Sequence, residues 1–546
     1  MSQRNGSRDP DALNATSRAG RLLAWVALVA ALVLLNASVT FRNVWPTPSV
    51  TWTGELSIEV PAALLALALC SRWRGPLSRA VLHGVTACWL LLVVGRYVNV
   101  TAPALWGREL NFYWDLHFLP DVAAMLMGAT SGWVAAVAVA VSVVVLLLAY
   151  IALSISWARV ARAAAHPREW RWLVSAAAVV LGLFAVEWSS APTSDVSRFP
   201  EPVTVAYARQ IGFVIDAARG ARGLPASPSF DADLEQLGGA DVLLLFLESY
   251  GAVTFEQPEF TRRLEPSRTS LANAIQASGF DVASAYVESP TFGGSSWFAH
   301  ITLMSGIEVR DPDTNALLMT ARRDTLPTVF ARRGYRSIAV MPGLWYPWPE
   351  GAFYGFADVY TGERLQYKGA PFGWWSLPDQ FTLAKLDELE INKSPRPPLF
   401  VFYPTVSTHT PFAPTPPYQP DWPRMLTDRP FDDAQLDRAY LEEPDWMNLA
   451  PSYVTSVTYA YEMLAGYVRR HTGRDLAIVV IGDHQPPALV SGEHAPWDVP
   501  VHIVTNRRPI VERLLRQGFR TGVTPQRPSL GKMHTLTPML LEAFSH

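Results

Sequence analysis

The sequence predicts two dissimilar parts: an N-terminal α-helical transmembrane bundle of about five spans, and an α/β domain with a largely parallel sheet between helices. Hydrophobic residues make up 49% of the 546 residues and charged residues only 17%, and the shortage of charge falls in roughly the first 190 residues. From residue 240 onward, short apolar runs alternate with helical patterns. We therefore predict a membrane anchor over 21–188, a linker over 189–237 and a large globular domain over 238–546.

Five apolar segments have lengths near the ~20 residues that a helix needs to cross a bilayer. They run approximately over 21–40, 55–72, 79–99, 132–156 and 171–188. The second segment is the weakest, because Glu55, Glu59 and Pro61 intrude at its start. We interpret the apolar stretch 120–131 as an interfacial or re-entrant piece, since a sixth span would reverse the topology.

The distribution of arginine predicts the orientation of these spans. Arginines gather in residues 1–21, after the second segment and after the fourth, whereas the loops 41–54 and 100–131 are poor in them. By the positive-inside rule, residues 1–20 are cytoplasmic and everything after about residue 190 lies outside. A cleaved signal peptide is the alternative for the first segment, but four further apolar segments argue against it. A net charge of −3 gives no support for a nucleic-acid partner.

Polar residues follow the predicted strands of the outer domain. The apolar runs 241–247, 336–341, 399–403 and 476–481 are typical of buried parallel strands. Glu248, His409, Asp483 and His484 come in the loops after three of them, and sites in such sheets form at the carboxyl ends of the strands. Taken singly, a glutamate after a strand is more often a helix N-cap or first-turn residue, and an Asp-His pair is more often a simple turn. Together they predict a zinc or manganese site, because carboxylates and imidazoles are ligands for these ions.

A serine-rich turn is the candidate for a nucleophile. Gly293-Gly294 permits close backbone approach, and Ser295 then opens an apolar, helix-like run. A hydroxyl at a helix N-terminus lies beside backbone N–H groups that bind phosphate oxygens. A metal on the same oxygen would favour its alkoxide form. The alternative is that Ser295 or Ser296 is only a helix N-cap.

The ordered set of motifs resembles a known superfamily. Leu247-Glu248-Ser249, Gly294-Ser295-Ser296, Thr408-His409-Thr410-Pro411-Phe412 and Gly482-Asp483-His484 resemble, in this order, the lipoteichoic acid synthases and phosphoethanolamine transferases of the alkaline phosphatase/sulfatase superfamily. The resemblance implies that Glu248, Ser295, Asp483 and His484 hold one divalent metal ion, zinc or manganese, and it allows for a second. It makes Ser295 the nucleophile. It gives His409 contact with the substrate phosphate or assistance to the leaving group, and it gives substrate contacts to His494 and Trp345.

Several departures narrow this expectation. The arginine that lipoteichoic acid synthases carry shortly after the tryptophan is replaced by Pro347, which puts glycerol-phosphate recognition in doubt. Both cysteines, Cys70 and Cys88, lie in apolar runs, so the outer domain has neither a disulfide nor the cysteine-derived formylglycine of ordinary sulfatases. We expect a transferase in a bacterial inner membrane. It moves a phospho-linked head group from a lipid donor to an envelope glycan or lipid. A hydrolase with the same site and a non-catalytic membrane scaffold are the alternatives.

Overall fold

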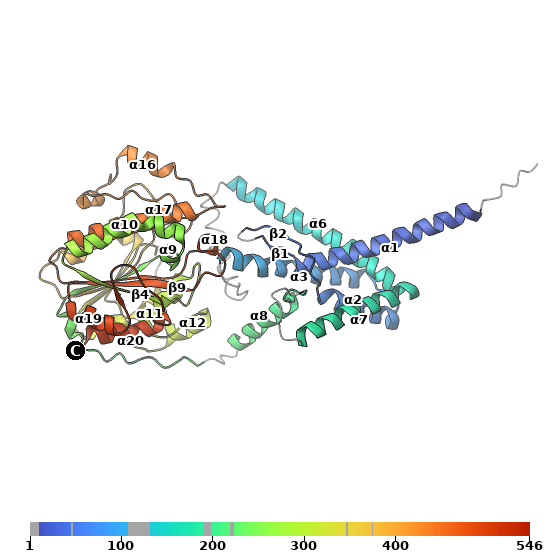
Figure 1. Cartoon of the computed structure of the whole chain (residues 1–546), viewed down its shortest axis with the longest axis horizontal. Coiled ribbons are helices and arrows are strands. Elements are labelled where there is room, and N and C mark those ends of the chain that lie inside the picture. Colours follow the sequence, from blue (N-terminus) through green and yellow to red (C-terminus); the bar gives the residue numbers. More distant parts are fainter. Residues whose placement is uncertain are drawn as a thin grey trace, which may run out of the picture. The chain divides into compact units, whose positions relative to one another are not determined.

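The computed structural model describes residues 10–44, 47–106, 132–189, 198–218, 223–344, 348–373 and 375–546. The chain divides into two compact units (Figure 1). Met1–Pro103 and Glu109–Arg219 form the first, and Ala104–Arg108 and Gly220–His546 form the second.

The first unit has a helix at each of the five predicted apolar segments. These are α1 (Pro10–Thr40), α2 (Glu59–Arg74), α3 (Arg79–Trp106), α6 (Gly132–Ala165) and α7 (Pro167–Ser189). Among the described residues, α1, α3, α6 and α7 are long and apolar enough to cross a bilayer. Helix α2 has 16 residues, which corresponds to about 24 Å against a hydrocarbon core of about 30 Å. The predicted helical membrane bundle is confirmed, with four qualifying spans. The stretch 120–131 lies outside the described residues.

A further helix, α8 (Val203–Ala218), lies within the predicted linker and belongs to the first unit. The backbone N–H of Thr204 donates to Glu59 of α2 (3.3 Å), and the Tyr207 hydroxyl donates to the carbonyl of Leu91 in α3 (2.7 Å). A Cβ at Gly95 would lie 2.4 Å from the Tyr207 hydroxyl, so glycine makes this close approach possible. A short hairpin of β1 (Arg42–Asn43) and β2 (Val50–Thr51) completes the described part of the unit.

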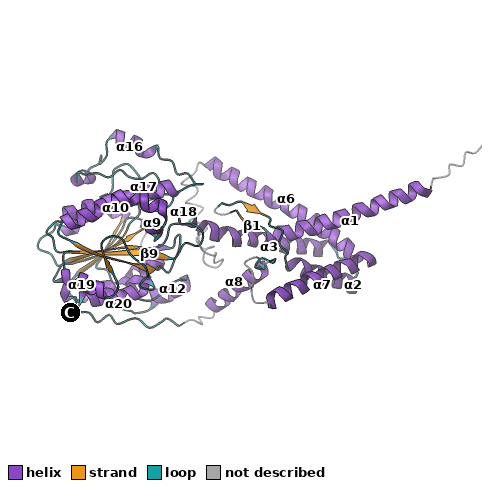
Figure 2. Cartoon of the chain, in the orientation of Figure 1, coloured by secondary structure: helices purple, strands orange, loops and turns teal. Residues whose placement is uncertain are grey.

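The second unit is built on an eight-stranded mixed sheet with the order β10-β4-β9-β8-β3-β7-β5-β6. Figure 2 shows the strands of this sheet with helices on either side of it. The strands β8, β3, β7, β5 and β6 are parallel to their neighbours within this group, whereas β9, β4 and β10 are added antiparallel. This confirms the predicted α/β domain with mostly parallel strands. The strands are β3 (Asp241–Leu247), β4 (Asp281–Glu288), β5 (Arg336–Met341), β6 (Asp358–Thr361), β7 (Leu399–Pro404), β8 (Leu476–Gly482), β9 (Asp498–Thr505) and β10 (Arg520–Thr521).

Helices cover both faces of this sheet, and successive residues of β3 point into two different cores. Leu243, Leu245 and Leu247 pack in the core beneath α10 and α17, whereas Val242, Leu244 and Phe246 pack in the core beneath α11, α19 and α20. The longer helices of the unit are α10 (Pro258–Ala277), α11 (Ser296–Ser305), α12 (Pro312–Thr320), α13 (Leu326–Arg332), α15 (Asp379–Leu386), α16 (Asp433–Tyr440), α17 (Ala450–Arg470), α19 (Arg508–Arg516) and α20 (Met533–Phe544). One-turn helices are η2 (Glu235–Leu237), α9 (Val253–Glu256), η3 (Pro349–Tyr354), α14 (Gly362–Leu365), η4 (Asp387–Ile391), η5 (Trp422–Leu426) and α18 (Ala488–Ser491).

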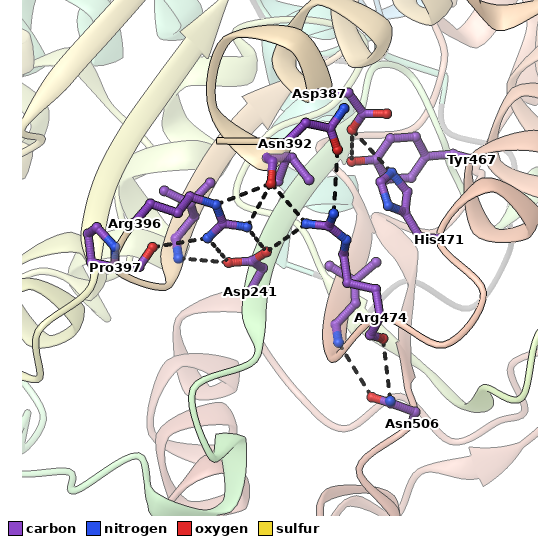
Figure 3. Close-up of polar contacts among 12 residues, drawn as sticks. Asp241, Asp387, Asn392, Arg396, Pro397, Tyr467, His471, Arg474 and Asn506 are labelled. Atoms are coloured by element: carbon purple, nitrogen blue, oxygen red, sulfur yellow. Dashed lines mark hydrogen bonds and ion pairs between the residues drawn. The ribbon is translucent and has the colours of Figure 1, made fainter. Parts of the chain in front are cut away.

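A buried polar network ties together the amino ends of the central strands (Figure 3). Asp241, the first residue of β3, accepts two hydrogen bonds from the Arg396 guanidinium (2.7 and 2.5 Å) and one from the backbone N–H of Leu399 in β7 (3.0 Å). Beside it, Asp387 accepts from Tyr467 (3.2 Å) and pairs with His471 (3.1 Å). The network lies at the opposite end of β3 from Glu248, so it fixes the strands without touching the candidate site.

Candidate metal centre

Two adjacent parallel strands deliver the acidic side chains of the site. Leu247, the last residue of β3, pairs with Gly482, the last residue of β8, so Glu248 and Asp483 emerge next to each other. The loops that follow are in close contact, since a Cβ at Gly482 would lie 1.8 Å from the Tyr250 carbonyl oxygen. The backbone N–H of Ser249 donates to Asp483 Oδ1 (2.8 Å), which links the two loops directly.

Glu248, Asp483 and His484 form a compact group of potential metal ligands. One donor atom from each lies within 4.8 Å of the others. His484 Nδ1 lies 2.7 Å from the Gln485 carbonyl oxygen, which can only accept, so Nδ1 carries the hydrogen. The unprotonated Nε2 then faces the carboxylates, 3.4 Å from Glu248 Oε1 and 3.8 Å from Asp483 Oδ2. This is the orientation in which a histidine binds a metal ion.

The serine that reaches this group is Ser296, not Ser295. The Ser296 hydroxyl donates to Glu248 Oε2 (3.0 Å) and lies 3.2 Å from His484 Nε2. Ser295 is the N-cap of α11 and has a left-handed backbone conformation with φ of 61°. This turn directs the next side chain, the first of the helix, toward the carboxylates. Among the described contacts Ser295 makes none with the three ligand residues, so Ser296 becomes the candidate nucleophile.

The loop before α11 is fixed to the ligand loop after β8. The Ser289 hydroxyl donates to the Asp483 carbonyl (2.5 Å), and the backbone N–H of Gly293 donates to the Gln485 carbonyl (3.1 Å). Gly293 and Gly294 both have positive φ, of 66° and 150°, so their backbone conformations favour glycine. These contacts hold Ser296 at the ligand group.

The electrostatics of the group favour a divalent cation. Burial raises the pKa of Glu248, but its interactions with His484 and His409 and the hydrogen bonds from Asp483 and Ser296 outweigh it and bring the pKa to about 2. Burial and the Glu248 charge raise the pKa of Asp483 well above its ordinary value, because two negative charges at this site repel each other. A divalent cation would offset that repulsion, and burial lowers the pKa of His484, which favours the neutral imidazole that binds metals. Two buried carboxyl groups, an imidazole and a hydroxyl are a donor set that fits zinc or manganese.

The loop after β7 brings His409 to the same edge of the sheet. Thr408 Oγ1 donates to the Glu248 carbonyl (2.6 Å), and Thr405 Oγ1 accepts from the Glu248 N–H (3.1 Å). His409 Nδ1 lies 2.7 Å from the Thr410 carbonyl, so the other ring nitrogen is free to meet a substrate. His409 is half-buried, as expected for a side chain that lines an accessible site.

Asp379 holds this loop in place and was not predicted. It is 2% exposed, and its carboxylate accepts hydrogen bonds from Tyr403 (2.6 Å), the Val406 N–H (2.8 Å) and the Ser407 N–H (2.8 Å). Its position, directly after Pro378 at the start of α15, is also that of an ordinary helix-start aspartate. No local pattern therefore distinguishes it.

Two predicted substrate contacts remain predictions. The His494 side chain is 90% exposed and its only described ion pair is with Glu493 (3.6 Å), so the structure does not bring it into the ligand group. Trp345 lies outside the described residues.

One family model matches part of the second unit. Residues 311–500 are similar to the Sulfatase family model. The match includes His409, Asp483 and His484, whereas Glu248 and Ser296 precede it. The predicted resemblance to the alkaline phosphatase/sulfatase superfamily, and the prediction of an enzyme, are confirmed by this match. No curated protein matches the chain in sequence.

Solved structures extend the similarity to the membrane unit. The integral membrane lipooligosaccharide phosphoethanolamine transferase EptA from Neisseria meningitidis is 12% identical, and the match covers 95% of this chain and 96% of EptA with a TM-score of 0.50. The lipoteichoic acid synthase LtaP from Listeria monocytogenes is 15% identical over 57% of this chain and 79% of its own, with a TM-score of 0.36. The phosphoglycerol transferase GacH from Streptococcus pyogenes is 13% identical over 59% and 85%, with a TM-score of 0.36. At these identities the similarity to EptA shows a shared fold.

Proposed function

We propose that the protein is a membrane-anchored, metal-dependent transferase that moves a phospho-linked head group from a lipid donor to an envelope glycan or lipid. Ser296 is the nucleophile. The observation that carries the proposal is the contact of the Ser296 hydroxyl with both Glu248 (3.0 Å) and His484 (3.2 Å) in a group of buried metal-binding side chains. One zinc or manganese ion is bound by Glu248, Asp483, His484 and Ser296, and the proposal allows for a second ion. The bound cation supplies positive charge that favours the serine alkoxide and the anionic transition state.

The reaction proceeds in two steps: the head group is transferred first to Ser296 and then from Ser296 to the acceptor. Ser296 loses its proton to solvent, and its Oγ forms a bond to phosphorus while the bond from phosphorus to the lipid oxygen breaks. His409 donates a proton to that departing oxygen. In the second step His409 accepts the proton of an acceptor hydroxyl, which attacks phosphorus and displaces Ser296 Oγ. The head group is thereby transferred without net consumption of water.

The membrane unit supports a lipid donor. Four described helices qualify as spans, and an enzyme tethered to the bilayer meets a lipid substrate at a high effective concentration. The arginine distribution supports a catalytic unit outside the cytoplasm. As part of the proposal, this side is the periplasmic side of a bacterial inner membrane.

Mass spectrometry of lipids and envelope glycans tests the proposal. Cells that produce the wild-type protein should carry a phospho-linked head group on a glycan or lipid that is missing from cells producing Ser296→Ala. Ser295→Ala is the matched control and should resemble the wild type. Identical head-group patterns in wild type and Ser296→Ala would contradict the transferase. Release of the head group into water, with no modified acceptor, would identify a hydrolase instead.

A further inference from the structure

A groove with a volume of about 390 Å³ lies between α16, α17 and the loop that follows His409. This volume is within the range of small-molecule sites, roughly 300–1,000 Å³. Figure 1 shows α16 on the outside of the layer formed by α10 and α17. The mechanism proposed above makes no use of the groove. Its polar lining includes Thr415, Tyr418, Glu442, Thr458, Tyr459 and Glu462.

The groove shares its walls with the elements that support the metal centre. Thr415 belongs to the same loop as His409, and its hydroxyl donates to the Phe412 carbonyl (3.1 Å). Phe412 packs edge-on against Tyr453 of α17 with ring centroids 5.1 Å apart. The Tyr453 hydroxyl donates to the carbonyl of Ser249, the residue after Glu248 (2.8 Å). A chain of packed residues therefore connects the groove to the loop that carries Glu248.

A second connection runs through Tyr459. Its hydroxyl, buried at the inner side of the groove, accepts from the Gln380 N–H (3.1 Å). The neighbouring Asp379 accepts from the Val406 and Ser407 N–H groups (2.8 Å each), just before His409. Two independent sets of contacts thus join the groove to the loop that presents His409.

The chemistry of the lining fits a carbohydrate. Carboxylates and amides are planar groups that bond two adjacent hydroxyls at once, and the groove supplies Glu442, Glu462 and the amide of Gln435. Threonine and tyrosine hydroxyls add groups that both donate and accept, and the Tyr418 ring offers an apolar surface. Arg438 adds one cation, whose Nε donates to the Ala434 carbonyl (3.0 Å). Partial burial raises the pKa of Glu442 and of Glu462.

We infer that this groove binds the glycan acceptor of the transfer reaction. The inference rests on the proposed function, because it makes the acceptor a glycan and assigns it to a groove lined in part by the loop that follows His409. The recognised chemistry is a polyhydroxylated sugar chain, held by paired hydrogen bonds to Glu442 and Glu462 and by the surface of Tyr418.

Saturation-transfer NMR on the full-length protein in a sugar-free detergent tests the inference. The probe is the oligosaccharide fraction released by mild acid from the envelope of the producing cells. All samples carry Ser296→Ala, so that binding is measured without chemistry. Sugar signals should appear in this background, disappear when Thr458→Trp fills the groove, and remain with Thr472→Trp, an exposed control position after α17.

Each result decides the question. Equal signals with Thr458→Trp, or no signals in the Ser296→Ala background, would overturn the inference. If Thr458→Trp fails to fold, Glu442→Gln replaces it and should weaken binding about tenfold, and unchanged binding would again refute the groove. Failure of the transferase itself is recognised separately, by unchanged head-group patterns in the cells described above.

Discussion

Replacement of Asp379 by asparagine should slow catalysis without loss of the cation. Asp379 Oδ1 accepts from Tyr403 and the Val406 N–H, whereas Oδ2 accepts from the Ser407 N–H (2.8 Å). An asparagine can keep the first two bonds through its carbonyl, but its amide then faces the Ser407 N–H, and two donors oppose each other. One charge-assisted bond, worth about 1.5–3 kcal/mol, is lost inside the protein. Because Ser407 leads directly to His409, we expect kcat to fall by about 10- to 100-fold through displacement of His409.

Turnover of a phospholipid donor in mixed micelles, together with metal content and thermal unfolding, measures this effect. Asp387→Asn is the matched control, because Asp387 is 1% exposed and also accepts several hydrogen bonds, but in the network at the other end of the sheet. Both variants should lose similar stability, and only Asp379→Asn should lose kcat. An unchanged kcat in Asp379→Asn, or an equal loss in Asp387→Asn, would refute the assignment of Asp379 as the residue that positions His409.

Three further outcomes are expected. Ser296→Ala should reduce turnover by at least about 10³-fold and abolish a phosphoseryl adduct in intact-mass spectra. The turnover of Ser295→Ala should stay within about threefold of wild type. A phosphoseryl adduct on Ser295 would reverse the assignment. Removal of the metal with a chelator should stop turnover and lower the unfolding temperature, because Glu248 and Asp483 are left facing each other. Added zinc or manganese should restore both the turnover and the unfolding temperature. Turnover that survives chelation would exclude the metal centre. Burial lowers the pKa of His502 to about 3 from 6.5, so the unfolded chain takes up a proton that the folded chain does not. Stability should accordingly fall as pH drops from about 6.5 toward 3 and stay level above that range, and denaturant unfolding of His502→Gln should show a weaker dependence.

The sheet and its ligands could be predicted because both follow from short-range patterns. An unbroken apolar run such as 241–247 has few alternatives to a buried parallel strand, and parallel strands bring their carboxyl ends to one edge. Glu248, Asp483 and His484 were therefore predicted to converge before their order in the sheet was known. The register of β3 and β8, which makes them neighbours, depends on contacts between distant segments and could not be read from either strand alone.

The choice between Ser295 and Ser296 as nucleophile could not be made from the sequence, for a physical reason. Two adjacent serines present the same chemistry, and the choice depends on the left-handed conformation of Ser295, which no periodic pattern indicates. The role of Asp379 and the groove between α16 and α17 could not be predicted for a related reason. Each depends on backbone groups or surfaces that are assembled from separate segments. Helix α2 shows the converse limit, because composition predicted its existence and type but not whether it is long enough to span.

The attachment of α8 to the first unit has a consequence for how the enzyme could be divided. Its hydrogen bonds are to Glu59 in α2 and to Leu91 in α3, which both belong to the membrane unit. Helix α8 is therefore part of the membrane unit and not of the catalytic unit. A soluble fragment cut at residue 190 would carry an amphipathic helix deprived of its partner surface. A fragment that begins after Ala218 lacks this helix and should therefore be more soluble and aggregate less.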